Sequence, residues 1–423
     1  MPTPMPDSAC PRCRTALVTH LSEVPWCPAC LWNIDAFEPG DKKGPLRRLY
    51  RRLAFRAAFG TFRALQTGDD PARGATAVAL GLVSLVIGAL LLAMLALGVR
   101  LSTADFPAPT LLPGVPLILF ALWLRPRFGK TDPHATVLTR PVSPALFALI
   151  DRVAAALDTR APHRVEFVED AVSAGYVAGI GRRRVLRIGA TGWLMYTPQE
   201  RVAILAWCLA SLRDGHAADA MASQLALRTF GRVSDMFLAP PNPRWNHWCR
   251  GNTRMALIER LVAVLMLPVS ALCWGAELAV WRLAVPGFQR DHYRDDRAAS
   301  AVAGGEAMRT LLDKHLLTAE LHTVASAMAR RGEFAAPGLI AAAGEVMDRR
   351  AGDLPALRQA TIRRDTALSD GAPALGFRIA LLGDLAPAGA AVVSSRAESE
   401  AVDAELAPHI KRLRGKVASD WYN

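Results

Sequence analysis

Long apolar runs without charge dominate the first third of the chain. Residues 74–99 carry no charged side chain and are rich in Leu, Val and Ala, and residues 106–124 form a second uncharged run. The first run is long enough to cross the hydrocarbon core of a bilayer. Four prolines in the first half of the second run predict either a helix that begins near Pro116 or a re-entrant segment. The pattern predicts a transmembrane hairpin at residues 74–130, with buried core helices as the alternative.

After residue 131 the pattern becomes that of a globular domain. An amphipathic helix is predicted at Pro144–Leu157. Strands are predicted at Arg164–Val168 and Val185–Ile188, because apolar and polar residues alternate there. A glycine-spaced turn over residues 174–181 is expected to join them. The sheet should therefore be small and mixed with helices.

Helix boundaries are marked clearly from Thr197 onward. Thr197-Pro-Gln-Glu200 has the sequence of a capping box, so a helix must begin there. That helix continues to Arg213 and is apolar on nearly every face, which predicts burial on most sides. Alanine-rich helices follow from residue 298 and end in an amphipathic helix over 394–416, with breaks predicted at Gly304-Gly305, Pro337, Gly352 and 371–373.

Two CxxC pairs lie near the N-terminus, Cys10-Pro-Arg-Cys13 and Cys27-Pro-Ala-Cys30. Each pair lets two thiolates turn toward one ion, and four thiolates around Zn²⁺ form a closed tetrahedral site with no open position. The spacing predicts a structural zinc ribbon, with four unrelated cysteines as the alternative. Zinc would supply the folding energy that so short a segment lacks, so a docking or stabilising module is expected rather than a catalyst.

Composition and charge favour a membrane protein. Hydrophobic residues make up 52% of the 423 residues, more than a soluble chain normally carries, and the formal net charge is +12. Basic residues bunch beside the apolar runs, most densely in the linker 41–73, which is expected to lie on the membrane as an amphipathic segment. Their distribution predicts a protein of the cell membrane with its soluble domains in the reducing cytoplasm. Membrane lipid is the expected partner and nucleic acid is not.

The motif order from Val165 to Arg213 resembles the core of the HtpX and CAAX-prenyl-endopeptidase family of membrane zinc metallopeptidases. Ser173-Ala174 stands at the edge-strand motif of that family, and Thr197-Pro-Gln-Glu200 at the start of its zinc helix. The resemblance implies an α+β, mostly helical fold, with a zincin-like metallopeptidase core and a small mixed sheet. It also implies that the edge strand near Ser173 and Ala174 binds an extended peptide by strand addition.

The zinc helix of this family carries HExxH, but the matching residues here are Trp207-Cys208-Leu209-Ala210-Ser211. In HExxH, two histidines four residues apart grip one zinc ion and the glutamate polarises its bound water. Trp207 has no lone pair to offer, and Ser211 is a poor neutral ligand. Cys208 lacks the carboxylate of a general base. Two ligands and the base are absent together, so no catalytic residue and no catalytic zinc are expected.

The third zinc ligand of the family, a glutamate on a downstream helix, falls on His292 within Gln289–Asp296. Asp296 matches the family aspartate that supports a zinc-ligating histidine. Because that histidine is absent here, Asp296 is expected to pair with another side chain, either Arg213 or Arg297.

Three functions remain open at this point. The main hypothesis is a catalytically inactive pseudopeptidase with a peptide-binding, regulatory or scaffold role, whose partners are peptides or segments of membrane proteins. The first alternative is an active zinc-dependent endopeptidase with substituted ligands, whose relocated site would combine His216, His292 and Asp296. The second alternative is a zinc-ribbon docking protein anchored to the membrane, which would bind a protein or nucleic acid through its first seventy or so residues.

A third apolar run, over residues 261–281, lies between the two motifs and contains Pro268. A single membrane crossing there would place the two motif helices on opposite faces of the bilayer. We therefore expect an interfacial, re-entrant or buried helix that is kinked at Pro268. The predicted domains are the ribbon at 1–40, the linker at 41–73, the transmembrane hairpin at 74–130, the metallopeptidase-like domain at 131–317 and a C-terminal helical region at 318–423.

Overall fold

The computed structural model groups the chain into two units. The globular unit comprises Met1–Asp70, Phe128–Ala217 and Gln289–Asn423, and the apolar unit comprises Pro71–Arg127 and Ala218–Phe288. The described residues are 8–17, 25–27, 29–30, 32–33, 45–68, 74–103, 111–124, 131–133, 135–179, 182–213, 229, 253–366, 371–383 and 389–419.

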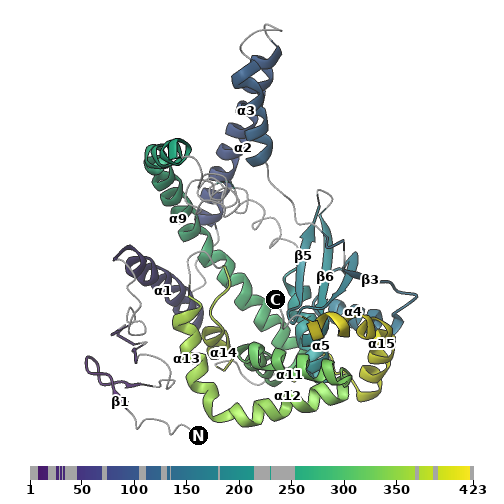
Figure 1. The fold of residues 1–423 in the computed structure, drawn as a ribbon. Helices are drawn as coiled ribbons and strands as arrows, with labels where there is room; N and C mark the ends of the chain where they lie inside the picture. Colours follow the sequence, from purple (N-terminus) through teal and green to yellow (C-terminus); the bar gives the residue numbers. More distant parts are fainter. Residues whose placement is uncertain are drawn as a thin grey trace. The chain divides into compact units, whose positions relative to one another are not determined.

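The described part of the globular unit is mostly helical and contains a small mixed sheet, as the sequence predicted (Figure 1). Its strands are β1 (Ser8–Ala9), β2 (Ala16–Leu17), β3 (Thr136–Leu138), β4 (Arg164–Val168), β5 (Ala174–Ala178) and β6 (Arg183–Gly189). Its shorter helices are α1 (Pro45–Gln66), α4 (Pro144–Ala156), α5 (Ala190–Met195), α6 (Pro198–Ala210), α10 (Gly305–Leu316), α11 (Thr318–Arg331), α12 (Ala336–Arg350), η1 (Ala351–Asp353), α13 (Leu354–Arg364), α14 (Leu375–Gly383) and α15 (Arg396–Ser419).

The main sheet has the strand order β3-β4-β6-β5. β4 and β6 pair in parallel, and the two outer pairs are antiparallel, so β5 forms one edge. The predicted strand Arg164–Val168 is confirmed. The predicted turn over 174–181 is wrong for its first five residues, which form β5. Tyr176 and Val177 favour extended backbone, and the turn begins only at Gly179, whose φ is +71°.

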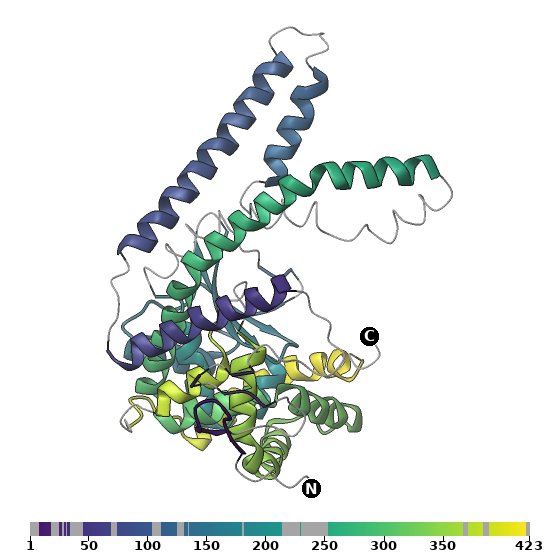
Figure 2. The ribbon, with the colours of Figure 1, turned by 90° about the vertical axis from the view of Figure 1, so that its left-hand side faces the viewer.

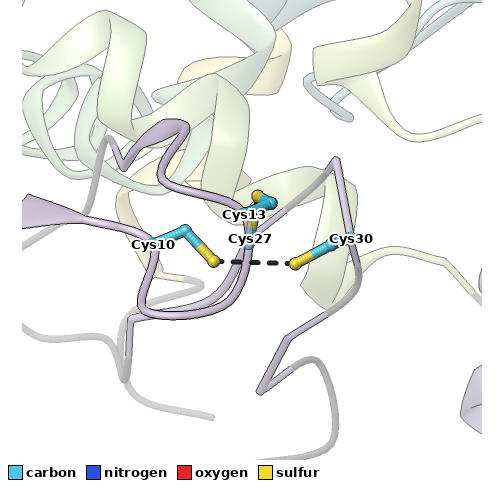
Figure 3. Close-up of side chains that lie close together, drawn as sticks. All are labelled: Cys10, Cys13, Cys27 and Cys30. Carbon is cyan, nitrogen blue, oxygen red and sulfur yellow. Dashed lines mark hydrogen bonds between the residues drawn. The ribbon is translucent and has the colours of Figure 1, made fainter.

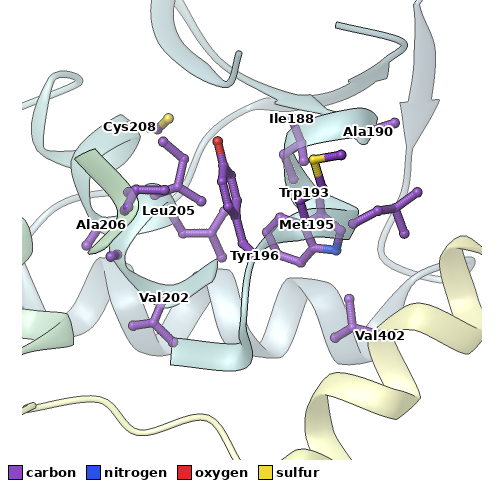
Figure 4. Close-up of a cluster of buried hydrophobic side chains, with 14 of the residues drawn as sticks. Ile188, Ala190, Trp193, Met195, Tyr196, Val202, Leu205, Ala206, Cys208 and Val402 are labelled. Atoms are coloured by element: carbon purple, nitrogen blue, oxygen red, sulfur yellow. The ribbon is translucent and has the colours of Figure 1, made fainter. Parts of the chain in front are cut away.

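One hydrophobic core joins the sheet to the helices of the globular unit. The inner face of β4 and β6 contributes Val165, Phe167, Leu186 and Ile188, all fully buried. Figure 4 shows part of this core, where Trp193 of α5 and Leu205 of α6 lie in one cluster with Val402 of α15. α6 is buried on nearly all sides, as its apolar sequence predicted.

Glu405 of the last helix, α15, caps the N-terminus of α4, although the two helices are far apart in the sequence. Two backbone amides at the start of α4 donate to the Glu405 carboxylate, Ala145 at 2.7 Å and Leu146 at 3.1 Å. We expect Glu405→Ala to lower the free energy of unfolding by about 1–2 kcal/mol, since both amides lose their acceptor. Urea unfolding of the full chain in mild detergent measures this. Glu400→Ala, on the same helix but in an exposed ion pair, is the control and should change stability little; equal losses would contradict the cap.

In the apolar unit, α2 (Gly74–Thr103) packs against α3 (Leu111–Leu124). Small residues allow the close approach: a Cβ on Gly98 would lie 2.7 Å from the Ile118 side chain. α3 begins at Leu111 rather than near Pro116, which lies inside the helix. Among the described residues, Val78–Thr103 is the one helical segment long and apolar enough to cross a membrane. The second crossing of the predicted hairpin stays a prediction, because α3 has only 14 residues.

A single helix, α9 (Thr253–Ala303), runs from the apolar unit into the globular unit (Figure 2). The predicted helix over 261–281 is therefore continuous with the downstream motif helix, and both Pro268 and Pro286 lie within α9. Val280 and Ala284 pack against residues of α2 in a small apolar cluster. Its interfacial or re-entrant placement in a membrane stays a prediction.

Candidate functional site

Four cysteine thiols converge near the N-terminus, on the loops that follow β1 and β2 (Figure 3). The sulfur atoms of Cys10 and Cys30 lie 3.6 Å apart, those of Cys13 and Cys27 lie 3.4 Å apart, and all four fall within 4.8 Å of one another. Four sulfurs bound to one zinc ion at 2.3 Å would lie about 3.8 Å apart. The cluster is therefore compatible with a structural metal ion, in agreement with the residues that the sequence predicted.

The local environment of these thiols separates their acidities. Hydrogen bonding to Thr15 lowers the pKa of Cys13 to about 6, which favours its thiolate. Burial raises the pKa of Cys30 to about 12 and raises that of Cys27. Although burial opposes this, hydrogen bonds also lower the pKa of Cys10. Metal binding must therefore remove protons from Cys27 and Cys30, because the thiolate is the ligand.

A buried tryptophan links the cysteine cluster to the rest of the globular unit. Trp26 precedes Cys27, is 2% exposed, and meets Phe55 of α1 edge to face at 5.7 Å. Phe55 in turn lies 6.2 Å from Phe377 of α14. The rings of Trp26, Phe55 and Phe377, which we call the aromatic ladder, thus connect the cysteine cluster with α14, the helix that carries Arg378.

The predicted capping box at the start of α6 is confirmed. The Thr197 hydroxyl accepts a hydrogen bond from the Glu200 amide at 3.4 Å, and the Glu200 carboxylate accepts one from the Thr197 amide at 2.7 Å. Glu200 also forms a buried ion pair with Lys314 at 2.6 Å, which ties α6 to α10. This register places Trp207–Ser211 at the C-terminal end of α6, where the helix ends.

Trp207 contacts His292, although the two residues are far apart in the sequence. Their rings stack at a centroid distance of 5.8 Å with 20° between the planes. The Arg378 guanidinium carbon also lies 5.3 Å from the centre of the Trp207 ring. The positions that the resemblance aligns with the first and third zinc ligands are thus in contact, and an indole ring occupies the first of them.

Asp296 is bound by a side chain that sequence reasoning missed. Arg378 donates two hydrogen bonds to its carboxylate, at 2.8 and 2.6 Å, and both side chains are buried. The predicted partners were wrong: Arg213 donates to the Leu157 carbonyl and Arg297 to the Leu65 carbonyl. A signal existed, since Arg378 is the lone charge in the apolar helix α14, and a buried charge requires a partner.

Cys208 and Ser211 face the edge strand and show no catalytic environment. Cys208 is fully buried, and burial raises the pKa of its thiol, so it remains protonated. The Ser211 hydroxyl donates to the Cys208 carbonyl at 2.8 Å.

The carboxyl group of Asp295, which precedes Asp296 on α9, has a raised pKa. Burial raises this pKa to about 8, and the charges of Asp296 and Asp291 add to the effect.

The predicted peptide-binding residues differ in their exposure. Ser173 is 3% exposed, and its hydroxyl accepts a hydrogen bond from the Gly189 amide at 3.1 Å. Its side chain therefore stabilises the end of β6 and is not exposed for contact with a peptide. Ala174 is half-buried and begins the edge strand β5. Gly175, the next residue of β5, packs closely against α6: a Cβ at this position would lie 2.0 Å from the Cys208 carbonyl oxygen.

Gly175→Ala is expected to lower the free energy of unfolding by about 1–3 kcal/mol, because β5 must move away from α6 to admit the methyl group. Urea unfolding in detergent measures the change. Gly344→Ala in α12 is the control: its Cβ meets nothing within 4 Å, so alanine should stabilise that helix by about 0.5–1 kcal/mol. Equal stability of the two variants would contradict the close approach of β5 to α6.

A catalytic zinc does not fit the residues at the end of α6. Trp207 offers no lone pair there, and the Asp296 carboxylate is engaged by Arg378. In the part of the chain that the structure describes, the four cysteines form the one group of three or more His, Cys, Asp or Glu side chains with ligand spacing. His216 lies outside the described residues, so the relocated site of His216, His292 and Asp296 stays a prediction.

Comparison of the chain with protein-family models, with curated proteins and with solved structures finds no match.

Proposed function

We propose that this chain is a membrane-anchored pseudopeptidase that binds extended peptides without hydrolysing them, built on a zincin-like core of the HtpX and CAAX-prenyl-endopeptidase type. The contact between Trp207 and His292 carries the proposal. A family core would bring these two positions together around zinc, and here they meet through stacked rings. The β3-β4-β6-β5 sheet, with its antiparallel edge strand beside α6, supports the same core.

The chemistry of the blocked site supports binding without cleavage. Hydrolysis by a zinc peptidase needs a metal-bound water and a carboxylate that takes its proton. Loss of the general base alone typically costs about a hundredfold to ten-thousandfold in rate. At the base position this chain has a buried, protonated thiol, Cys208. Arg378, beside Trp207, already holds the Asp296 carboxylate in a buried ion pair, so that carboxylate is not available to support a metal ligand.

The edge strand supplies what peptide binding requires. An added strand bonds to backbone amides and carbonyls, which need neither metal nor ionised side chains. β5 pairs with β6 on one side only in the described sheet. The segment that would bind peptide is therefore Ala174–Ala178, with Gly175 allowing it to approach α6.

The candidate membrane span and the cysteine cluster complete the proposal. Val78–Thr103 would anchor the chain in the cell membrane, with the globular unit in the cytoplasm. The four cysteines would hold a structural Zn²⁺ ion, since thiolates prefer soft or borderline metals and tetrahedral sulfur sites are typical of zinc. Neither feature takes part in peptide cleavage.

Incubation of the full chain in detergent with reduced, alkylated casein peptides tests the proposal. We expect slower amide exchange in residues 174–178 and no new peptide termini by mass spectrometry. The other edge strand of the sheet, β3 at residues 136–138, is the internal control and should exchange at an unchanged rate. New termini that disappear on chelation, in a variant that lacks Cys10 and Cys13, would show an active peptidase instead.

A further inference from the structure

Helix α1 has an apolar face that is buried within the globular unit. Phe55, Ala58, Phe62 and Leu65 are buried in a cluster with residues of α14 and with Tyr293. Phe62 stacks on Phe377 at a centroid distance of 4.9 Å. Because its apolar face packs on the globular unit, α1 is not free to insert that face into a bilayer, as the amphipathic linker expected from the sequence would.

The face of α1 next to this apolar face carries arginine. Arg52, Arg56 and Arg63 are exposed, and at 100° per residue they fall within about 40° of one another on the helix. We call these three residues the arginine face. The helix contains six arginines and no acidic residue between Pro45 and Gln66, so its own sequence offers no countercharge.

The position of α1 in the sequence points to the partner. Only residues 67–73 separate it from α2, the candidate membrane span. A cluster of arginines directly before a span is the arrangement that attracts anionic lipid headgroups, each arginine contributing about 1 kcal/mol near the surface. A single-stranded nucleic acid is favoured less, since such sites stack bases on exposed aromatic rings, whereas Phe55 and Phe62 are buried.

We propose that the arginine face of α1 binds anionic phospholipid headgroups at the membrane surface while its apolar face holds the helix on the globular unit. Contact with lipid is then electrostatic and peripheral, without insertion. The surface is distinct from the blocked site on α6, and the proposal does not depend on pseudopeptidase function.

Arginine footprinting of the full chain in nanodiscs tests this surface. The chain is placed in discs of phosphatidylcholine alone or with about one third phosphatidylglycerol, and an arginine-selective dicarbonyl reagent is followed by mass spectrometry. We expect the arginine face to react at least about fivefold more slowly in the anionic discs, the factor that one headgroup contact supplies. The difference should shrink in about 0.5 M salt, which screens exposed charges. Arg331 and Arg396, exposed on α11 and α15, are the internal controls.

Three outcomes of the footprinting would overturn the proposal. Equal rates in the two kinds of disc would remove the lipid contact, and equal slowing of Arg331 and Arg396 would make it non-specific. Protection by added RNA in neutral discs, without protection by phosphatidylglycerol, would identify nucleic acid as the partner.

Co-purification of lipid provides a second measurement. The variant R56Q/R63Q should co-purify with several-fold less phosphatidylglycerol than the control variant R331Q/R396Q; equal retention by the two variants contradicts the proposal.

Discussion

Replacing Arg378 with methionine is expected to lower the free energy of unfolding by about 3–5 kcal/mol, because it leaves the Asp296 carboxylate buried without its two hydrogen bonds. Asp296 is 1% exposed, so water does not reach it in the intact core. Burial opposes the charge of Arg378, yet Asp296 raises the pKa of Arg378 above its ordinary value, so the guanidinium stays charged. The variant also removes the cation beside the Trp207 ring. Urea unfolding of the full chain in mild detergent measures the loss.

A second ion pair of the same geometry provides the control. Arg358 of α13 donates to Asp313 at 2.9 and 2.7 Å, but its side chain is 31% exposed. Arg358→Met should cost less, about 1–3 kcal/mol, because shortening this partly exposed side chain opens the buried Asp313 carboxylate to water. The double variant R378M/D296N should recover part of the larger loss, because it removes the stranded charge. Equal costs for the two methionine variants would contradict a buried, closed site.

Removal of the metal is expected to unfold the cysteine cluster completely. Its two strands have two residues each and its apolar cluster is small, so we expect a bound metal ion to supply the folding energy, about 10–16 kcal/mol in zinc-finger peptides. The loss should also reach α1 and α14, because Trp26 rests on Phe55 and Phe55 on Phe377. Amide exchange after chelation should therefore rise fully in residues 8–17 and partly in α1 and α14.

The sheet and α6 serve as the reference within the same experiment. They belong to the main core rather than to the aromatic ladder, and their exchange should stay unchanged. Cys273→Ser, on α9 and outside the cluster, is the matched cysteine variant and should leave the exchange pattern as it is. Protection of residues 8–17 that survives chelation would contradict a metal-dependent fold.

The sequence predicted the elements whose signals are local. The capping box at Thr197 and Glu200 fixed the start of α6, since it satisfies two amides within four residues. Alternation predicted β4 with its observed bounds. Spacing of the four cysteines predicted the cluster, because each CxxC turn brings its own pair together.

Features that depend on distant contacts were missed. β5 was predicted as a turn because of its glycines, but Gly175 is required by the approach to α6 and does not break the strand. Nothing near Asp296 in the sequence indicates Arg378, which reaches it from α14. The extent of α9 was missed as well: the predicted helix ended at residue 281, whereas α9 continues to Ala303 with Pro268 and Pro286 inside it.

Metal content of the purified full chain tests the central claim most directly, namely that the site on α6 holds no metal and the four cysteines hold one. Elemental analysis would compare the intact chain with C10S/C13S, in which two of the four thiol ligands are removed. We predict one metal ion per chain in the intact protein and none in the variant. A second metal ion that remains in C10S/C13S would contradict the account and make His292 and His216 candidate ligands of a working peptidase.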